Sequence, residues 1–567
     1  MRKLLTKYIV LLVVTFAASI LIYNYVEASS SIETENDLLS VQNEKENNYL
    51  LKTNYSIDDP MVILNPYGTS PLTALVVFQT KDLTTTTVTI KGKNGNDLVH
   101  TFTPAKIHIL PIYGLYPEYD NKIVIQASGK TKELTIKTEK LPDDFAKVTH
   151  VNKNDFETDE FYFTTPEDKG YTAAYDVYGE VRWYIIGDYK WDIQRLSNGH
   201  ILMSSDKTIS GSYSVGLMEM DLLGKVYFEY AVPGGYHHNV YELNNGNLLL
   251  ASNNFESNTV EDYIVEIDRN SGNIIKTIDL NEALKNKSKG NWFKITSLVY
   301  DRNTNSITVS GYNSNMLVNI DYSSLNVNWV IGEKVNDDIQ NLVLKNNDNS
   351  SYPTNPESIN LLNDQMIFVN TIDGERYLTT YKIDYSNRTF TETYKYRLGG
   401  DKHSYLEVLS SDDYVVSQGN AIKEIIKGKE SISFDVNSLL YNTKRMPFYA
   451  NDIYTGVKGV RLGTLGVSTP SRDYLLFSVK NKDISKKYNI SLYKDVYGLK
   501  VKGSFSKDDK VQIILDNVLD KKTYELKIND NGVSSRYINE EGIKGKYYIF
   551  LRINGKIYKL YKYVIFK

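Results

Sequence analysis

A sequence pattern that recurs through the middle of the chain constrains the fold more than any other feature. The pattern is an Asp, a tight turn, and then a β-branched residue before an aromatic one, as in Asp176–Trp183 and Asp221–Phe228. Looser copies begin at Asp268, Asp321 and Asp384, so successive Asp positions lie 45, 47, 53 and 63 residues apart. A repeat of this length holds about four strands, which is the size of one propeller blade.

A second pattern, a polar turn between two apolar stretches, accompanies the first. It is clear in Leu196–Leu202 (LSNGHIL) and Leu243–Leu249 (LNNGNLL). Weaker copies start at Asp301, Leu362 and Leu409. Five repeats are visible, and a sixth can be assembled from Phe161–Phe163 and the strands after Gly419, which would close a ring. We therefore expect a six-bladed β-propeller over residues 145–465, with five or seven blades or a β-solenoid as alternatives.

Strand patterns continue on both sides of the repeats. Residues 55–142 contain short strands such as TALVVFQT and KELTIKT, with turn signals at Asn94-Gly95 and Ser128-Gly129, and they match one immunoglobulin-like β-sandwich in size. Residues 480–567 alternate in the same way and predict a small C-terminal accessory β-sandwich. Residues 29–54 are polar and charged, which is typical of a linker. The predicted fold class is all-β throughout.

The N-terminus has the composition of an export signal. Arg2, Lys3 and Lys7 precede the apolar run Tyr8–Tyr23, and Val26-Glu27-Ala28 offers small residues for cleavage. Residues 1–28 predict a signal peptide or an uncleaved membrane anchor, and we favour cleavage. We therefore expect an extracellular or cell-surface protein, either released or attached to the membrane or cell wall.

Composition removes several classes of chemistry. The 567 residues include no Cys and only seven His, so thiol nucleophiles, disulfides and Cys-ligated metals are excluded. A disulfide-free exported protein suits a Gram-positive surface. The net charge of −4 argues against a nucleic-acid partner.

Two adjacent histidines form the strongest local signal for a functional site. His237 and His238 follow Gly234-Gly235 and stand at the start of a predicted strand. Strand alternation directs one of them inward, where it would act in the propeller channel as an acid, a base or an oxyanion donor. A pair of surface turn histidines is the alternative, and the strand register decides which ring faces inward.

Several phrases, taken in order, resemble the bacterial aryl-sulfate sulfotransferase family. They include Tyr67–Leu75 and His108–Tyr116 near the N-terminus, then GGYHHNVYELNNGNLLL, NWFKITSLVYDRNTNSITVSGYNSNMLVNID and HSYLEVLSSDDYVVSQGN. The resemblance covers residues from about 60 to 465 and leaves out the C-terminal domain. It implies an exported six-bladed propeller with an N-terminal immunoglobulin-like domain, needing no nucleotide sulfate donor and no cofactor.

The resemblance also implies a chemistry. In the family, a channel His attacks the sulfur of a phenyl sulfate, a sulfo-histidine forms, and a phenol then takes the group. Other His residues and an Arg stabilise the sulfate oxygens and protonate the leaving phenol. These are nucleophilic catalysis and electrostatic stabilisation of an anion.

The family's site residues are carried over position by position. His238 matches a family His, Lys294 stands where the family has a second His, and Tyr312 stands where it has an Arg. Glu357 falls on the position of the nucleophile. These four are the predicted catalytic residues. The predicted substrate-binding residues are His237, Asn239, Trp292 and His403.

Two functions follow from these substitutions. The first is sulfuryl transfer from a phenolic sulfate donor to a phenol acceptor by a rearranged site, and we lean toward this enzyme. The second is a non-catalytic cell-surface propeller that binds an aromatic, glycan or cell-wall ligand. No catalytic metal is predicted, and a structural ion and the oligomeric state stay open.

Overall fold

The computed structural model describes residues 55–449 and 475–566, together with residues 32–34, 42, 45 and 46. The first range has gaps at 155, 168–169, 207, 210–212, 255–256, 270–271 and 273. The second has gaps at 479–483, 496–497, 517–520, 529–531, 539–542 and 544. The chain divides into two compact units of unequal size.

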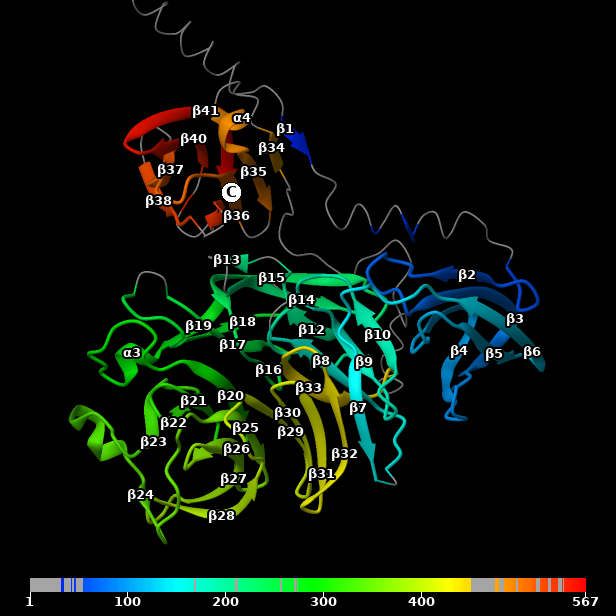
Figure 1. Ribbon diagram of the computed structural model, residues 1–567, viewed down its shortest axis with the longest axis horizontal. Helices are drawn as coiled ribbons and strands as arrows, with labels where there is room; N and C mark the ends of the chain where they lie inside the picture. Colours follow the sequence, from blue (N-terminus) through cyan, green and yellow to red (C-terminus); the bar gives the residue numbers. More distant parts are fainter. Residues whose placement is uncertain are drawn as a thin grey trace, which may run out of the picture. The chain divides into compact units, whose positions relative to one another are not determined.

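Besides the sheet of the N-terminal domain, the larger unit contains six sheets that follow one another along the chain, and the main strands of each pair antiparallel (Figure 1). Each has four strands in meander order, and three of them carry extra strands. Neighbouring first strands contact one another, as β20 does β25, β25 does β29 and β29 does β33. The predicted all-β fold is confirmed, and the six sheets are consistent with the predicted six-bladed β-propeller.

Each of the first three blades has four main strands, named from the innermost outward. Blade 1 holds β33 (Leu440–Met446), β8 (Phe161–Pro166), β9 (Thr172–Tyr175) and β10 (Val181–Ile185). Blade 2 holds β11 (Gln194–Arg195), β12 (Ile201–Ser204), β14 (Tyr213–Met220) and β15 (Val226–Tyr236), with β13 (Thr208–Ile209) between β12 and β14 in the chain. Blade 3 holds β16 (Val240–Glu242), β17 (Leu248–Ser252), β18 (Tyr263–Ile267) and β19 (Ile274–Asp279).

The second half of the ring follows the same order. Blade 4 holds β20 (Ile295–Asp301), β21 (Ser306–Gly311), β22 (Met316–Asp321) and β23 (Val327–Ile331). Blade 5 holds β25 (Glu357–Leu362), β26 (Gln365–Ile372), β27 (Glu375–Asp384), β28 (Thr389–Arg397) and β24 (Lys345–Asn346). Blade 6 holds β29 (Ser404–Ser410), β30 (Asp413–Gln418), β31 (Ala421–Ile426), β32 (Lys429–Val436) and β7 (Val148–Lys153). Two short helices, α3 (Leu280–Ala283) and η1 (Asp337–Leu342), lie in the connections after blades 3 and 4.

Two strand exchanges close the ring. The late strand β33 pairs with β8, and the early strand β7 pairs with β32. Blades 1 and 6 are therefore each built from both ends of the propeller sequence. The sixth blade that the sequence predicted from Phe161–Phe163 and the strands after Gly419 matches the first of these exchanges.

The repeated Asp has a structural role in the turns. Asp176 Oδ1 accepts the backbone N–H groups of Tyr178 and Glu180, each at 3.0 Å. Asp321 Oδ1 likewise accepts from Ser323 and Ser324 at 3.1 and 2.6 Å. A carboxylate that satisfies two turn N–H groups replaces the bonds that a strand would make there. The sequence repeat thus marks the hairpin that leads to the outermost strand of a blade.

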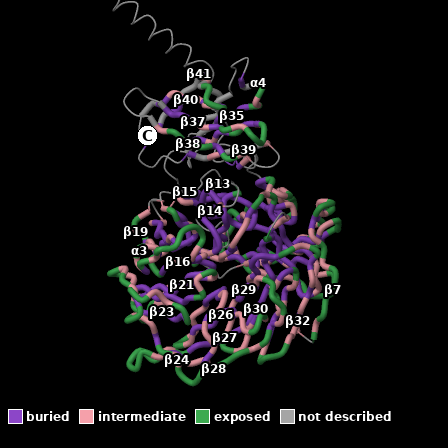
Figure 2. The backbone as a smooth tube through the Cα atoms, turned by 60° about the vertical axis from the view of Figure 1, so that its left-hand side comes forward, coloured by how far each residue is buried: buried purple, intermediate pink, exposed green. Residues whose placement is uncertain are grey.

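Apolar side chains fill the space between adjacent blades. One core contains residues of blades 3 and 4, including Leu249, Ile264, Leu298 and Val318. Figure 2 shows this distribution, with buried strands inside the propeller and exposed turns at its outer ends. Sheet-on-sheet packing of this kind fixes the inner strands, and they in turn position the functional side chains.

The N-terminal domain forms one sheet from β2 (Met61–Leu64), β3 (Ala74–Ile90), β4 (Leu98–Ile112), β5 (Asp120–Ala127) and β6 (Lys130–Lys137). Its core is continuous with apolar residues of blades 1 and 6, such as Tyr162 and Val415. Arg182 of β10 joins the two parts: its guanidinium donates to Gly114 O at 2.9 and 2.7 Å and pairs with Asp176 at 3.1 Å.

The smaller unit has two sheets around one apolar core. The first contains β1 (Ile32–Thr34), β34 (Leu475–Ser478), β35 (Ser491–Asp495), β36 (Gly498–Ser504) and β39 (Val533–Ile538), and α4 (Ile484–Tyr488) precedes β35. The second contains β38 (Lys521–Leu526), β37 (Val511–Asp516), β40 (Gly545–Ile553) and β41 (Lys556–Phe566). A small C-terminal β domain was predicted, and its pairing with Ile32–Thr34 was not.

The predicted export segment, residues 1–28, lies outside the described residues. Two residues of the predicted linker are buried in the larger unit: Gln42 exchanges hydrogen bonds with the backbone of Val226, and Glu46 pairs with Lys225 at 2.8 Å. Among the helices of the described residues, none has the length and apolar character required to cross a membrane.

Candidate functional site

A cavity of about 210 Å³ lies where the inner strands of blades 1 to 6 meet. His238 lies on its wall with polar residues from the other blades, among them Gln194, Thr296, Ser358 and Asn442. Tyr405 and Tyr441 contribute aromatic rings 4.0 Å apart. The cavity is the central channel of the propeller.

Four consecutive blades have a residue with the same unusual backbone within three residues of the start of the inner strand. Trp191, His238, Lys294 and Ser358, in blades 2 to 5, have φ values of 66°, 58°, 56° and 52°. A left-handed conformation is unfavourable for residues with a Cβ, and it occurs often at functional sites that the surrounding fold holds in place. Two of the predicted catalytic residues occupy this position.

The two adjacent histidines form a directed chain of hydrogen bonds. His237 is fully buried, and its Nε2 lies 3.0 Å from the carbonyl oxygen of Ser252. A carbonyl only accepts, so His237 carries its proton on Nε2. Its Nδ1 then accepts from His238 Nδ1–H at 2.9 Å. His238 is left with a lone pair on Nε2, for which no partner occurs among the described residues.

Burial keeps both rings uncharged. Burial lowers the pKa of His237, and it lowers the pKa of His238 well below the ordinary 6.5, aided by the nearby His237, Lys294 and His403. Trp191 packs against the His238 ring with centroids 4.4 Å apart, and the Tyr441 hydroxyl donates to the His238 carbonyl at 3.3 Å. His238 is therefore a fixed neutral base at physiological pH.

Lys294, Tyr312 and His403 lie next to one another beside His238. The Lys294 ammonium lies 4.6 Å from the centre of the Tyr312 ring, and the His403 ring centre lies 5.2 Å from it. The described residues offer Lys294 no carboxylate partner. We call Trp191, His238, Lys294, Tyr312 and His403 the mouth cluster, since all but Tyr312 lie within the three residues that precede an inner strand.

Glu357 is fully buried beneath the mouth cluster. Its Oε1 lies 2.5 Å from His403 Nδ1, while its Oε2 accepts Ser404 N–H at 3.1 Å and an N–H of Arg376. Arg376 itself is 1% exposed, and its guanidinium carbon lies 5.7 Å from the centre of the Tyr312 ring. The four predicted catalytic residues and His403 thus come together, and Arg376 joins them.

The other predicted substrate-binding residues have different surroundings. Asn239 donates to Asp192 at 2.9 Å and accepts Leu298 N–H at 3.0 Å, so it ties blades 2, 3 and 4 together. The Trp292 indole donates to Asp262 at 2.6 Å, and the ring lines a separate hollow of about 250 Å³. His237 acts through its hydrogen bond to His238 and not through a contact with the substrate.

The sequence did not single out several channel residues. Lys444 of β33 lies in the channel wall, where burial opposes its charge but Asp192 and Glu407 raise its pKa. Its one local signal is an adjacent basic pair, Lys444-Arg445, inside a predicted strand. Arg376 follows a hairpin turn and has no local signal, because its partners Glu357 and Lys402 come from other parts of the chain. No set of three or more His, Cys, Asp or Glu suited to a metal ion occurs within the described residues.

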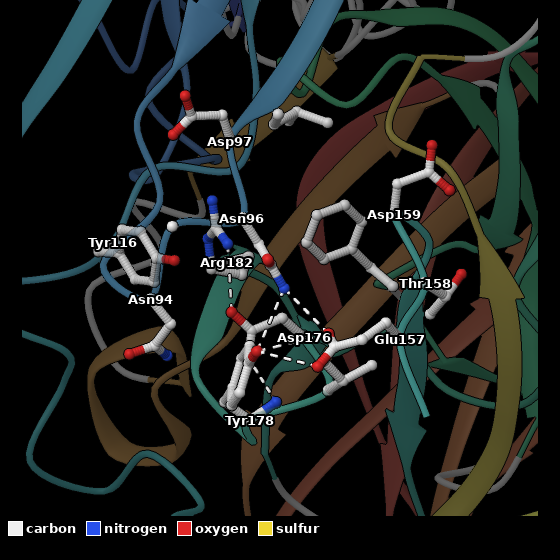
Figure 3. Close-up of a pocket in the computed structure, with 14 residues that line it drawn as sticks. Asn94, Asn96, Asp97, Tyr116, Glu157, Thr158, Asp159, Asp176, Tyr178 and Arg182 are labelled. Atoms are coloured by element: carbon white, nitrogen blue, oxygen red, sulfur yellow. Dashed lines mark hydrogen bonds and ion pairs between the residues drawn. The ribbon is translucent and has the colours of Figure 1, made fainter. Parts of the chain in front are cut away.

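A larger cavity, of about 530 Å³, lies between the N-terminal domain and blade 1 (Figure 3). Several of its polar groups bond one another. Asn96 donates to Glu157 at 3.0 Å and to the Tyr178 hydroxyl at 3.2 Å, and Arg182 pairs with Asp176. We interpret this cavity as the joint between two domains, and the channel as the functional site.

Two family models match this chain. A family model described as arylsulfotransferase (ASST) matches residues 138–425, and one described as the arylsulfotransferase Ig-like domain matches residues 61–141. Arylsulfate sulfotransferase AssT of Lelliottia amnigena is 23% identical over 292 residues, which are 39% of this chain and 49% of that protein. The chain thus matches about half the length of this relative.

Solved structures give weaker likenesses. A candidate 6-phosphogluconolactonase of Bacteroides fragilis has a TM-score of 0.34 at 11% identity, covering 65% of this chain and 99% of that one. The periplasmic gluconolactonase PpgL of Pseudomonas aeruginosa has a TM-score of 0.30 at 9% identity, covering 64% and 99%. Neither score supports an argument about fold or function. The two family models do: the larger one matches half of the chain, and the chain belongs to the arylsulfotransferase (ASST) family.

Proposed function

We propose that this protein transfers a sulfuryl group from a phenolic sulfate ester to a phenol at the mouth cluster. Family membership supports the substrate class. One observation carries the proposal: the His238 ring has an Nε2 lone pair without a partner among the described residues, and the charge that acts on this ring includes Lys294, an ammonium without a carboxylate partner among those residues. A base beside an unpaired cation suits a reaction between a phenol and an anionic sulfate ester.

Lys294 is the group that would bind the sulfate. A sulfate monoester carries one negative charge, and an ammonium attracts it as a point charge. The Tyr312 hydroxyl adds a hydrogen-bond donor. Burial of this side chain and the nearby charge of Glu357 raise the pKa of Tyr312, which keeps the hydroxyl protonated. Lys294 and Tyr312 therefore take over the anion-binding work that the family gives to a His and an Arg.

His238 would act as the base that activates the acceptor. Its low pKa rules out a role as a proton donor at neutral pH, since the ring is already deprotonated. Its Nε2 can take the proton of an incoming phenol as the phenol oxygen attacks sulfur. The Lys294 ammonium stands nearby to stabilise the leaving phenolate.

Aromatic side chains give the channel its affinity for a phenol ring. Trp191 meets Tyr441 edge to face with centroids 5.1 Å apart, and Tyr441 also contacts Tyr405. Such walls pack well against a second aromatic ring. The export signal would place this reaction outside the cytoplasm or at the cell surface, with the donor and the acceptor as its partners and no nucleic acid.

The direct test uses the full chain with 4-nitrophenyl sulfate as donor and phenol as acceptor. We expect acceptor-dependent release of 4-nitrophenol and equal formation of phenyl sulfate. His238→Ala should lower the rate by about 10²-fold or more, as expected for the loss of a positioned base. His150→Ala is the matched control, because His150 is exposed on β7.

Two results would contradict the proposal. One is an unchanged rate in His238→Ala. The other is saturable binding of 4-nitrophenyl sulfate without any release of 4-nitrophenol, which would favour the non-catalytic binding propeller. That alternative draws on one observation: three of the four positions carried over from the family hold other residues, Lys294, Tyr312 and Glu357.

A further inference from the structure

The position that the resemblance gives to the nucleophile is filled by a residue that cannot attack a substrate. Glu357 is fully buried, and both its oxygens are engaged. Its partners are Arg376, Ser404 N–H and His403. A carboxylate that neutralises a buried guanidinium would leave that charge unpaired if it moved toward the channel.

The same carboxylate binds and orients a histidine, His403, on the neighbouring blade. His403 directly precedes β29, and its Nδ1 lies 2.5 Å from Glu357 Oε1. A carboxylate accepts, so Nδ1 of the neutral ring carries the proton and Nε2 holds the lone pair. The side chain of His403 is 36% exposed, and no partner for Nε2 occurs among the described residues. A carboxylate behind a histidine fixes the ring and stabilises positive charge that develops on it.

His403 also stands next to the proposed sulfate site. Its ring centre lies 5.2 Å from that of Tyr312, whose ring in turn lies 4.6 Å from the Lys294 ammonium. The Arg376 guanidinium lies 5.7 Å from the same ring, next to the position where the family has its Arg. A histidine and a guanidinium are therefore both present here, each from a different part of the chain than the position that sequence matching indicates.

We propose that His403 is the nucleophile of this protein and that Glu357 is its positioning residue, an assignment that rests on the proposed function. His403 Nε2 attacks sulfur, an N–S bond forms, and the bond between sulfur and the aryl oxygen breaks. The aryl oxygen leaves as a phenolate and takes a proton from solvent. The sulfo-imidazole keeps its proton on Nδ1, and Glu357 balances the charge of the ring.

The second half of the cycle restores the enzyme. The oxygen of the acceptor phenol attacks sulfur while His238 Nε2 takes its proton. The N–S bond breaks, its electron pair returns to His403 Nε2, and the aryl sulfate product leaves. His238 then gives its proton to solvent, which its low pKa favours.

The test uses the full chain and 4-nitrophenyl sulfate without acceptor. We expect a burst of 4-nitrophenol equal to one equivalent of enzyme, and a peptide containing His403 that gains the mass of one SO₃ group. His403→Ala should lose the burst and the added mass and should turn over about 10³-fold more slowly with phenol present. Added imidazole should restore part of its 4-nitrophenol release, which a purely structural defect would not permit. His150→Ala again serves as the control.

Glu357 is tested separately through kcat and KM. Glu357→Gln keeps an acceptor for the ring proton but loses the charge, so kcat should fall about 10²-fold with donor KM nearly unchanged. Glu357→Asp should recover part of kcat. His403→Gln provides a second variant if His403→Ala fails to fold.

The outcomes separate the two proposals. Wild-type turnover with the SO₃ group on His238, or a folded His403→Ala with the wild-type rate, would overturn the assignment of His403 and leave the proposed function standing. No 4-nitrophenol release from wild type with donor and acceptor present would overturn the proposed function and the nucleophile with it. A burst and an adduct on His403 support both.

Discussion

The pair formed by Glu357 and Arg376 gives a quantitative prediction about stability. Arg376 is 1% exposed and also donates to Asn355 O at 2.9 Å, Thr371 Oγ1 at 2.6 Å and Lys402 O at 3.2 Å. Glu357→Gln keeps these three bonds but leaves the guanidinium without a counter-charge. Breaking a buried ion pair from one side costs about 3–5 kcal/mol. We expect a loss in that range in the free energy of unfolding.

A double-mutant cycle distinguishes this cost from general damage. Arg376→Met alone leaves Glu357 buried with only His403 and Ser404 N–H, and it should cost a similar amount. The double variant removes both charges, so its cost should fall short of the sum by about 2 kcal/mol or more. The assay is urea unfolding of the full chain at pH 8. The free energy of unfolding is taken from the transition in which the propeller unfolds. A cost below about 1 kcal/mol for Glu357→Gln, or additive costs in the double variant, would refute the reasoning.

Two further predictions concern charge. Lys294→Met should lower kcat/KM for 4-nitrophenyl sulfate by about 10- to 100-fold, the value of one charge-assisted contact, and should remove its dependence on ionic strength; an unchanged kcat/KM would show that Lys294 does not bind the sulfate. Burial raises the pKa of Asp221 to about 6 from its ordinary 3.8, so the folded state holds this proton at pH values where the unfolded state has lost it, and stability falls as pH rises toward 6. Relative to Asp221→Asn, wild type should therefore lose about 1 kcal/mol of unfolding free energy between pH 5 and pH 7, measured by urea unfolding, and a pH-independent difference would contradict this assignment.

Local sequence patterns were enough to predict the repeat architecture. Asp176 and Asp321 mark hairpins because their carboxylates bond backbone N–H groups two to four residues away, which a sequence pattern records directly. The ring closure by β33 could also be predicted from the sequence, because the repeat pattern left one blade incomplete.

The site was predictable only in part. His238 stood out because its Gly-Gly-Tyr-His-His context is local. The partnership of Glu357 with His403 was not predictable, because 46 residues, which include the four main strands of blade 5, separate them. The orientation of the His237–His238 chain depends on the carbonyl of Ser252 on a different strand. Burial, which sets the charge state of both rings, is a property of the assembled channel.

The initial-rate pattern of the full chain with 4-nitrophenyl sulfate and phenol tests the central claim most directly. If a sulfuryl group passes through the protein, double-reciprocal plots against donor at several phenol concentrations should be parallel, and phenyl sulfate should form in step with 4-nitrophenol release. Intersecting lines would contradict transfer through a sulfo-enzyme, and the absence of phenyl sulfate would contradict sulfuryl transfer itself.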